Sequence, residues 1–237
     1  MEIINTKSLD IWYDQKNLIL KDINLSLNTG AIYGLLGKNG SGKTTLMNTL
    51  CGVLMSFKGS VKIGKKDFSN SSNQRFIHDS KNQRFFIPDF PMILPYMNSI
   101  QFITFLLKTY NSSFTEEQIL EISERYNFSQ YLYTPMKNLS LGNKKKASII
   151  CSIIIDAPIL IFDEPLNGLD IQSIDTFLED LEQLSNNGKC IIISSHLLDI
   201  ITKITPNIIY ITNQKCFQIK LHNNDNIRKV LSDYDQL

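Results

Sequence analysis

Between an apolar run and a helical pattern, the chain contains Gly37-Lys38-Asn39-Gly40-Ser41-Gly42-Lys43-Thr44. This segment fits the pattern G-x-x-x-x-G-K-[ST], in which backbone N–H groups curl around phosphate oxygens. Lys43 would place a positive charge near the β- and γ-phosphates, and Thr44, with Thr45 beside it, would offer a hydroxyl to Mg²⁺. The alternative is an accidental glycine-rich turn. The strand before the segment and the helical pattern after it favour nucleotide-phosphate binding.

Three short runs are almost entirely apolar, as expected of strands buried on both faces of a parallel sheet. They are Ala31–Leu36, Ile159–Phe162 and Cys190–Ile193. Polar residues follow each run at once: the phosphate loop, then Asp163-Glu164, then Ser194-Ser195-His196. Ligands of open α/β sheets bind beyond the carboxyl ends of the strands. We therefore expect these three polar sets to converge on one site.

The rest of the chain divides by its hydrophobic pattern. Residues 2–28 alternate apolar and polar side chains with turn-like breaks, which predicts a small antiparallel layer, and residues 69–84 read as an exposed connection. Helical periodicity dominates from residue 91 to 155, where Thr115 precedes acidic residues as a helix N-cap would. We expect one domain, with a core at about residues 1–88 and 156–237 and an inserted helical subdomain at about 89–155.

Composition argues against several classes of protein. The chain has 237 residues, 43% of them hydrophobic, and a net charge of +1, which argues against disorder and against a basic surface for nucleic acid. Its four cysteines form no CxxC and its three histidines no metal-spaced set, as in a reducing cytosol. No signal peptide is apparent, and no apolar stretch reaches the ~20 residues of a membrane helix. We expect a cytoplasmic protein that crosses no membrane itself and binds no nucleic acid.

Asp163 and Glu164 place two adjacent carboxylates at the end of a predicted strand. Successive side chains of an extended segment point apart, so the two can have different tasks. Asp163 would face the metal, and Glu164 would act on an attacking water. An acidic turn that caps a helix is the alternative interpretation, which the neighbouring phosphate loop disfavours.

Three motifs accompany the phosphate loop: Leu139-Ser140-Leu141-Gly142-Asn143, Asp163-Glu164-Pro165-Leu166-Asn167-Gly168-Leu169-Asp170, and Ser194-Ser195-His196. In order and spacing they resemble the signature, the Walker B motif with the D-loop, and the switch histidine of the ATP-binding cassette (ABC) family. The resemblance implies an α/β fold, with a P-loop NTPase core and mainly parallel sheet, an N-terminal antiparallel β layer and an inserted helical subdomain. Residues 34–40 are also similar to the ATPases of two-component exporters and multidrug or peptide-resistance pumps.

The resemblance also implies roles for single residues. Tyr13 would stack on adenine, with Trp12 as the second candidate and a core aromatic as the alternative. His196 would contact the γ-phosphate and orient water, unless it is only structural. Ser140 and Gly142 would contact nucleotide bound to a second subunit, and Asp170 would lie in the D-loop that crosses to that subunit.

Two positions depart from the family pattern. Leu141 and Asn143 stand where the signature usually has Gly and Gln, so the backbone at Leu141 is either ordinary or slightly strained. Asp89 stands where a glutamine usually links Mg²⁺ to the membrane partner; it is either a metal ligand or only a loop acid. The run Lys144-Lys145-Lys146 is interpreted as a solvated helix face rather than a nucleic-acid patch.

Together these features predict a subunit that binds ATP and Mg²⁺, hydrolyses ATP and drives transport, with export favoured. A second ATPase subunit, identical or closely related, would complete the site. A separate integral membrane permease would dock near residues 85–97, unless those aromatic side chains are simply core, and would hold the protein at the inner face of the membrane. The alternatives are a soluble ABC ATPase without a transport role, such as a cluster-assembly partner, or a weakly hydrolysing regulatory cassette.

Overall fold

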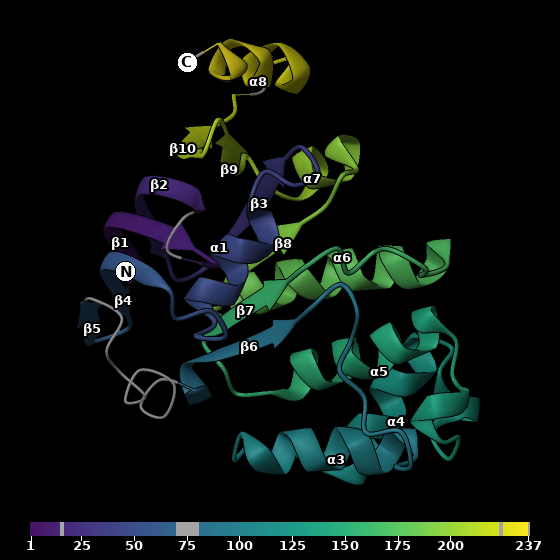
Figure 1. Ribbon diagram of the computed structural model, residues 1–237. Helices are drawn as coiled ribbons and strands as arrows, with labels where there is room; N and C mark the ends of the chain where they lie inside the picture. Colours follow the sequence, from purple (N-terminus) through teal and green to yellow (C-terminus); the bar gives the residue numbers. More distant parts are fainter. Residues whose placement is uncertain (15–16, 70–80, 223–224, 237) are drawn as a thin grey trace.

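A six-stranded sheet forms the centre of the protein in the computed structural model, which describes residues 1–14, 17–69, 81–222 and 225–236 (Figure 1). Its strand order is β10-β9-β3-β8-β7-β6. All neighbouring pairs are parallel except β9 with β10. The bounds are β3 (Ala31–Gly37), β6 (Arg84–Ile87), β7 (Ile159–Phe162), β8 (Cys190–Ser194), β9 (Asn207–Thr212) and β10 (Lys215–Lys220). The carboxyl ends of β3, β8, β7 and β6 therefore lie side by side, as the sequence predicts for the first three.

A second, antiparallel sheet has the order β2-β1-β4-β5. It consists of β1 (Glu2–Trp12), β2 (Leu18–Asn28), β4 (Phe57–Ile63) and β5 (Lys66–Ser69). The antiparallel layer expected from residues 2–28 is confirmed, and the β4–β5 hairpin extends it. Its alternating residues, such as Ile4, Leu9 and Ile23, are fully buried. They share one hydrophobic cluster with Leu46 and Met47 of α1 (Lys43–Leu50) and with one face of the central sheet.

Strand β7 shows why its sequence is continuously apolar. Ile159 and Ile161 belong to the cluster beneath the antiparallel sheet, whereas Leu160 and Phe162 belong to the cluster on the opposite face. That opposite face is covered by α6 (Ile171–Asn186) and α7 (Leu198–Ile204), while α8 (Ile227–Asp235) lies beyond β9 and β10 (Figure 1). Burial on both faces confirms the prediction for this strand.

Helices α3 (Ser99–Thr109), α4 (Glu116–Arg125) and α5 (Leu141–Ile154) lie between β6 and β7 in the chain. Two short 3₁₀ turns, Ser129–Tyr131 and Met136–Asn138, lie between α4 and α5, and a further turn, Lys81–Gln83, precedes β6. Thr115 caps α4 as predicted, in a capping box with Gln118. The helices share a hydrophobic cluster with the central sheet. The subdomain boundaries at residues 89 and 155 stay a prediction.

The structure corrects two expectations about exposed segments. Within residues 69–84, Lys81 and Asn82 are exposed as expected, but Arg84 is only 3% exposed because it begins β6 in the sheet; residues 70–80 lie outside the described residues. The lysine run is not a solvated helix face either, because Lys145 and Lys146 are 0% and 5% exposed. Both errors arise where tertiary contacts bury a charged side chain. Among the described residues, no helix combines the length and apolar character needed to cross a membrane.

The contact between α6 and β7 provides a test of the fold. Phe177 is fully buried, and its ring meets the ring edge of Phe162 at a centroid distance of 5.2 Å. We expect Phe177→Ala to lower the free energy of unfolding by about 3–5 kcal/mol, because it leaves a cavity against the central sheet. Denaturant unfolding measures this loss. The exposed Tyr133→Ala should change stability by less than about 0.5 kcal/mol; equal losses in both variants would contradict the packing.

Candidate nucleotide-binding site

The loop after β3 is shaped for an anion. Gly42 precedes α1 with a φ of 111°, and an added Cβ would lie 2.9 Å from Leu20, so another residue would be both strained and crowded. The Lys43 ammonium donates hydrogen bonds across the loop to the carbonyls of Gly37 (2.8 Å) and Lys38 (3.4 Å). Among the described residues, the buried Ser41 hydroxyl has no hydrogen-bond partner. A buried polar atom of this kind fits a site for phosphate oxygens.

A cavity of about 390 Å³ opens beside this loop. It brings together most of the residues that the sequence singles out: Tyr13, Asn39, Gly40, Gly42, Lys43, Thr44, Thr45, Asp89, Asp163 and Glu164. Tyr13 lies at its wall, 56% exposed, with its hydroxyl 3.1 Å from the Thr45 hydroxyl. Trp12 is not among the described residues that line this cavity. A stacking role for Tyr13 stays a prediction.

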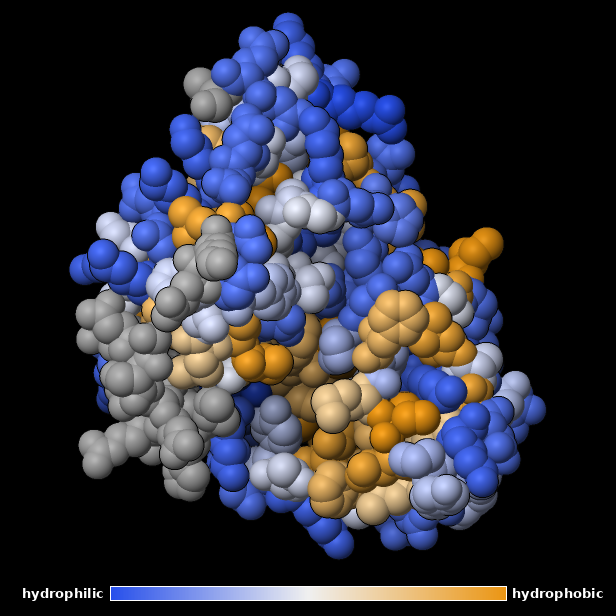
Figure 2. Space-filling model, in the orientation of Figure 1, coloured by the Kyte–Doolittle hydropathy of each residue, from blue (hydrophilic) through white to orange (hydrophobic). Residues whose placement is uncertain are grey.

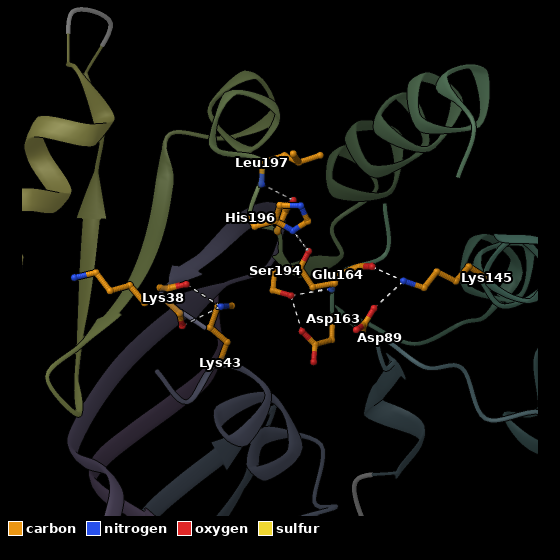
Figure 3. A network of polar contacts seen from close by, with 11 residues as sticks. Lys38, Lys43, Asp89, Lys145, Asp163, Glu164, Ser194, His196 and Leu197 are labelled. Atoms are coloured by element: carbon orange, nitrogen blue, oxygen red, sulfur yellow. Dashed lines mark hydrogen bonds and ion pairs between the residues drawn. The ribbon is translucent and has the colours of Figure 1, made fainter. Parts of the chain in front are cut away.

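Asp163 organises the centre of the site (Figure 3). The Thr44 hydroxyl donates to its Oδ2 at 2.6 Å, and the Ser194 hydroxyl donates to its Oδ1 at 2.6 Å. The backbone N–H of Asp163 donates to the carbonyl of Ile87 at the end of β6. A carboxylate and a hydroxyl side by side are hard oxygen donors, the kind that Mg²⁺ prefers. The residues present therefore fit the expected metal.

Glu164 has an unusual backbone, with a φ of 46°. This left-handed conformation costs about 1–3 kcal/mol for a residue with a side chain. Several contacts maintain it: the Glu164 N–H donates to the Ser194 hydroxyl (2.8 Å), and its carbonyl accepts from the Lys145 ammonium (2.6 Å). The carboxylate Oε2 lies 3.0 Å from Nδ1 of His196 (Figure 3). The structure thus brings the predicted water-activating pair together.

Asp89 faces the same cavity, but it already has a partner. Its Oδ1 lies 2.9 Å from the ammonium of Lys145, whose side chain is completely buried. A buried ammonium needs such an acceptor because its desolvation is costly. Asp89 therefore provides the acidic partner of Lys145, and its role as a metal ligand stays a prediction.

The signature residues lie elsewhere. Ser140 caps α5 by accepting a hydrogen bond from the N–H of Asn143, and Leu141 is the first residue of that helix, without a positive φ. Its backbone is therefore ordinary rather than strained. An added Cβ at Gly142 would clash with the carbonyl of Gly168, so the helix and the segment after β7 approach closely. Among the described residues, neither Ser140 nor Gly142 lines the cavity of this subunit.

Asp170 and Lys38 also point away from the cavity. Asp170 caps α6 and forms an ion pair with Lys146 at 2.7 Å; hydrogen bonds from Lys146 and Ser173 lower the pKa of Asp170 to about 2. Lys38 reaches toward α8, where its ammonium lies 3.0 Å from Oδ2 of Asp235. In the structure the Lys38 side chain therefore contacts α8 rather than the cavity.

A family model described as "ABC transporter" matches residues 20–167. The chain belongs to the ABC transporter family. This cassette is 36% identical over 203 residues to AlbC of Bacillus subtilis, named as an ABC transporter ATP-binding protein, with 86% of this chain and 85% of AlbC covered. It is 31% identical to the lantibiotic transport ATP-binding protein SrtF of Streptococcus pyogenes, covering 77% of this chain and 76% of SrtF.

Solved structures support the same fold. A dimeric bacterial ABC transporter cassette superimposes with a TM-score of 0.80 at 20% identity, over 93% of this chain and 100% of that one. The α/β fold predicted from the motifs is confirmed. The protein is an ATP-binding subunit of the ABC type and an ATPase.

Two residues at the cassette's site were not assigned roles from the sequence. Ser194 bridges Asp163 and Glu164, although the sequence marks it only as polar and close to His196. Lys145 contacts Glu164 and Asp89, but within three consecutive lysines nothing distinguishes it. The position of Ser194 at a strand end could have suggested a role, whereas Lys145 gives no local signal.

We expect Ser194→Ala to lower the free energy of unfolding by about 1–3 kcal/mol, because it leaves the Glu164 N–H and an Asp163 oxygen without their partner. ATP hydrolysis should also slow, since the Asp163 carboxylate and the Glu164 backbone each lose a positioning contact. Denaturant unfolding and phosphate release measure the two effects. Ser152→Ala, also a buried serine but bonded only within α5, is the control for hydrolysis. Unchanged hydrolysis in Ser194→Ala would contradict the bridging role.

Proposed function

We propose that the cassette binds ATP in the cavity beside residues 37–44 and that Glu164 activates the water that attacks the γ-phosphate. The observation that carries this proposal is the contact of Glu164 with His196 at the edge of the cavity that contains Lys43 and Asp163. A base adjacent to an orienting histidine and a phosphate-binding lysine suits in-line phosphoryl transfer to water.

Each residue then has a distinct task. Residues 37–44 hold the phosphates through backbone N–H groups, and Lys43 exchanges its contacts with the loop carbonyls for phosphate oxygens. His196 orients Glu164 and contacts the γ-phosphate. Thr44 and Asp163 would hold Mg²⁺, with Asp89 as a further candidate. The metal would neutralise charge on the phosphates.

A second ATPase subunit completes the site in this proposal. Ser140, Gly142 and Asp170 lie outside the cavity of their own subunit, and Ser140 caps the N-terminus of α5, where the helix dipole favours an anion. Exposed apolar side chains flank these motifs: Leu141 (42%), Ile171 (80%) and Leu197 (38%). Such residues suit a surface that another subunit covers. A similar cassette has been solved as a dimer, which supports pairing with a second copy. A head-to-tail arrangement would bring these motifs to the partner's cavity.

The membrane partner would dock on a hydrophobic groove next to α3. This docking groove has a volume of about 520 Å³ and includes Phe86, Phe90, Met92, Phe105 and Leu106. Figure 2 shows hydrophobic residues gathered on this part of the surface. Phe85 belongs to the core at 5% exposure, but Phe90 and Met92 are 76% and 84% exposed. Aromatic and Met-rich surfaces are typical of sites that receive an apolar helix.

We further propose that the transport direction is export and that the cargo is a peptide. The permease would hold the cassette at the cytoplasmic face of the membrane. The similarity to a lantibiotic transport subunit supports a peptide cargo. A weakly hydrolysing regulatory cassette is disfavoured by the Glu164–His196 contact and by the ordinary backbone at Leu141. A soluble ABC ATPase without a transport role remains the alternative that the docking experiment below tests.

Glu164→Gln tests the proposed hydrolysis. We expect ATP hydrolysis to fall by about 10²-fold or more while ATP still binds, because the amide cannot accept a proton from water. Nucleotide titration and steady-state phosphate release measure the two steps, and size-exclusion chromatography with ATP should show a trapped dimer. Glu182→Gln, on the exposed side of α6, is the control. Parental turnover by Glu164→Gln would refute the assignment.

The docking groove is tested by Phe90→Ser/Met92→Ser. Affinity purification of the parental cassette from detergent-solubilised membranes should recover one integral membrane protein in a stable complex, and the double variant should lose it, because its apolar contacts are removed. Tyr133→Ser, an exposed aromatic outside this groove, is the control and should retain the complex. Recovery of a soluble assembly protein instead would favour the non-transport alternative.

A further inference from the structure

Lys145 is a lysine whose side chain has no exposed surface, and its position requires an explanation. It lies on α5, about one turn after Leu141, which begins that helix. A fully buried ammonium is tolerated only where acceptors replace its water. Two acceptors do so here, and both belong to the site: the Glu164 carbonyl at 2.6 Å and Asp89 Oδ1 at 2.9 Å.

The contact with Glu164 acts on its backbone. Glu164 has a left-handed φ of 46°, so its peptide group has to be held by the surrounding structure. The N–H is fixed by Ser194 of β8, the carbonyl by Lys145 of α5, and the carboxylate contacts His196. The backbone contacts fix the point from which the Glu164 side chain projects, and the contact with His196 directs its carboxylate.

Asp89 in turn orients Lys145. Asp89 follows β6, whereas Glu164 follows the adjacent strand β7, so the ammonium bridges two neighbouring strand ends from a helix outside the sheet (Figure 3). The ion pair is partly buried, because the Asp89 side chain is 35% exposed whereas that of Lys145 is 0% exposed. Lys145 therefore connects the helix that Ser140 caps with the proposed base at the cavity.

We propose that Lys145 is a positioning residue for hydrolysis: with Asp89 as its counterion, it holds the peptide of Glu164 so that the carboxylate faces the attacking water. This inference rests on the proposed role of Glu164 and adds the contacts that align its backbone. Lys145 itself touches no nucleotide in this proposal. Its removal should therefore change the rate of the chemical step and leave ATP affinity nearly intact.

Lys145→Met tests the proposal, since methionine has a similar length but no donor. We expect kcat to fall about 10- to 100-fold, as small misplacements of catalytic groups do, while KM and the ATP dissociation constant change less than about threefold. Lys145→Gln retains an N–H donor and should be faster than Lys145→Met. Lys108→Met, an exposed lysine on α3, is the matched control and should keep parental kcat.

A double variant distinguishes positioning from a merely structural role. If Lys145 acts through Glu164, Lys145→Met should have almost no further effect on the residual single-turnover rate of Glu164→Gln. An equal proportional loss in both backgrounds, or parental kcat in Lys145→Met, would overturn the proposal. Circular dichroism checks folding; if Lys145→Met does not fold, Lys145→Gln carries the same comparison.

The same set separates this inference from the proposed function. Parental turnover by Glu164→Gln would refute the role of Glu164 itself. A slow Glu164→Gln together with a fast Lys145→Met would refute only the positioning role. Lys145→Gln that is no faster than Lys145→Met would also contradict it, because the donor would then be irrelevant.

Discussion

The carboxylate of Asp163 is the interaction on which the site depends. It accepts one hydrogen bond from the hydroxyl of Thr44, at the start of α1, and another from the hydroxyl of Ser194, at the end of β8. Three neighbouring strand ends, β3, β8 and β7, are thereby joined at one buried acid. Hydrogen bonds to a charged acceptor are stronger than neutral ones and are stronger still away from water. This short network fixes how the loop at residues 37–44 faces the segment that contains Glu164.

This hydrogen-bond network is supported by the well-packed parallel sheet from which its residues project. β7 is apolar on both faces, and each face is covered by its own hydrophobic cluster. Such burial can support an unfavourable conformation at the strand end, where Glu164 adopts a left-handed φ of 46°. The stability of the two clusters thus offsets local strain at the residue that we propose as the base. Strain of this kind is common at functional sites and cannot persist without a well-packed scaffold.

Much of this arrangement can be predicted from the sequence, because it is encoded locally. The apolar run at residues 159–162 specifies a strand buried on both faces, and the glycine-rich segment at 37–44 specifies a phosphate loop. The burial of Lys145 is different. Three successive lysines indicate a solvated face, and burial is made tolerable by contacts with Asp89, 56 residues away, and with the carbonyl of Glu164, 19 residues away. The left-handed backbone of Glu164 is likewise determined by partners on β8 and α5, not by its own sequence.

The two buried lysines show how one helix contacts the site and the adjacent segment at once. Because successive residues on a helix project in different directions, Lys145 reaches Asp89 and Glu164, whereas Lys146 reaches Asp170 and the carbonyl of Tyr126. Tyr126 donates to Asp180 of α6, so the second lysine also connects α5 to the helix that follows Asp170. A rigid displacement of α5 would therefore strain contacts at both ends of the segment from Glu164 to Asp170. Such a displacement would reach Glu164 through the peptide that Lys145 holds, without any contact between α5 and the γ-phosphate of its own subunit.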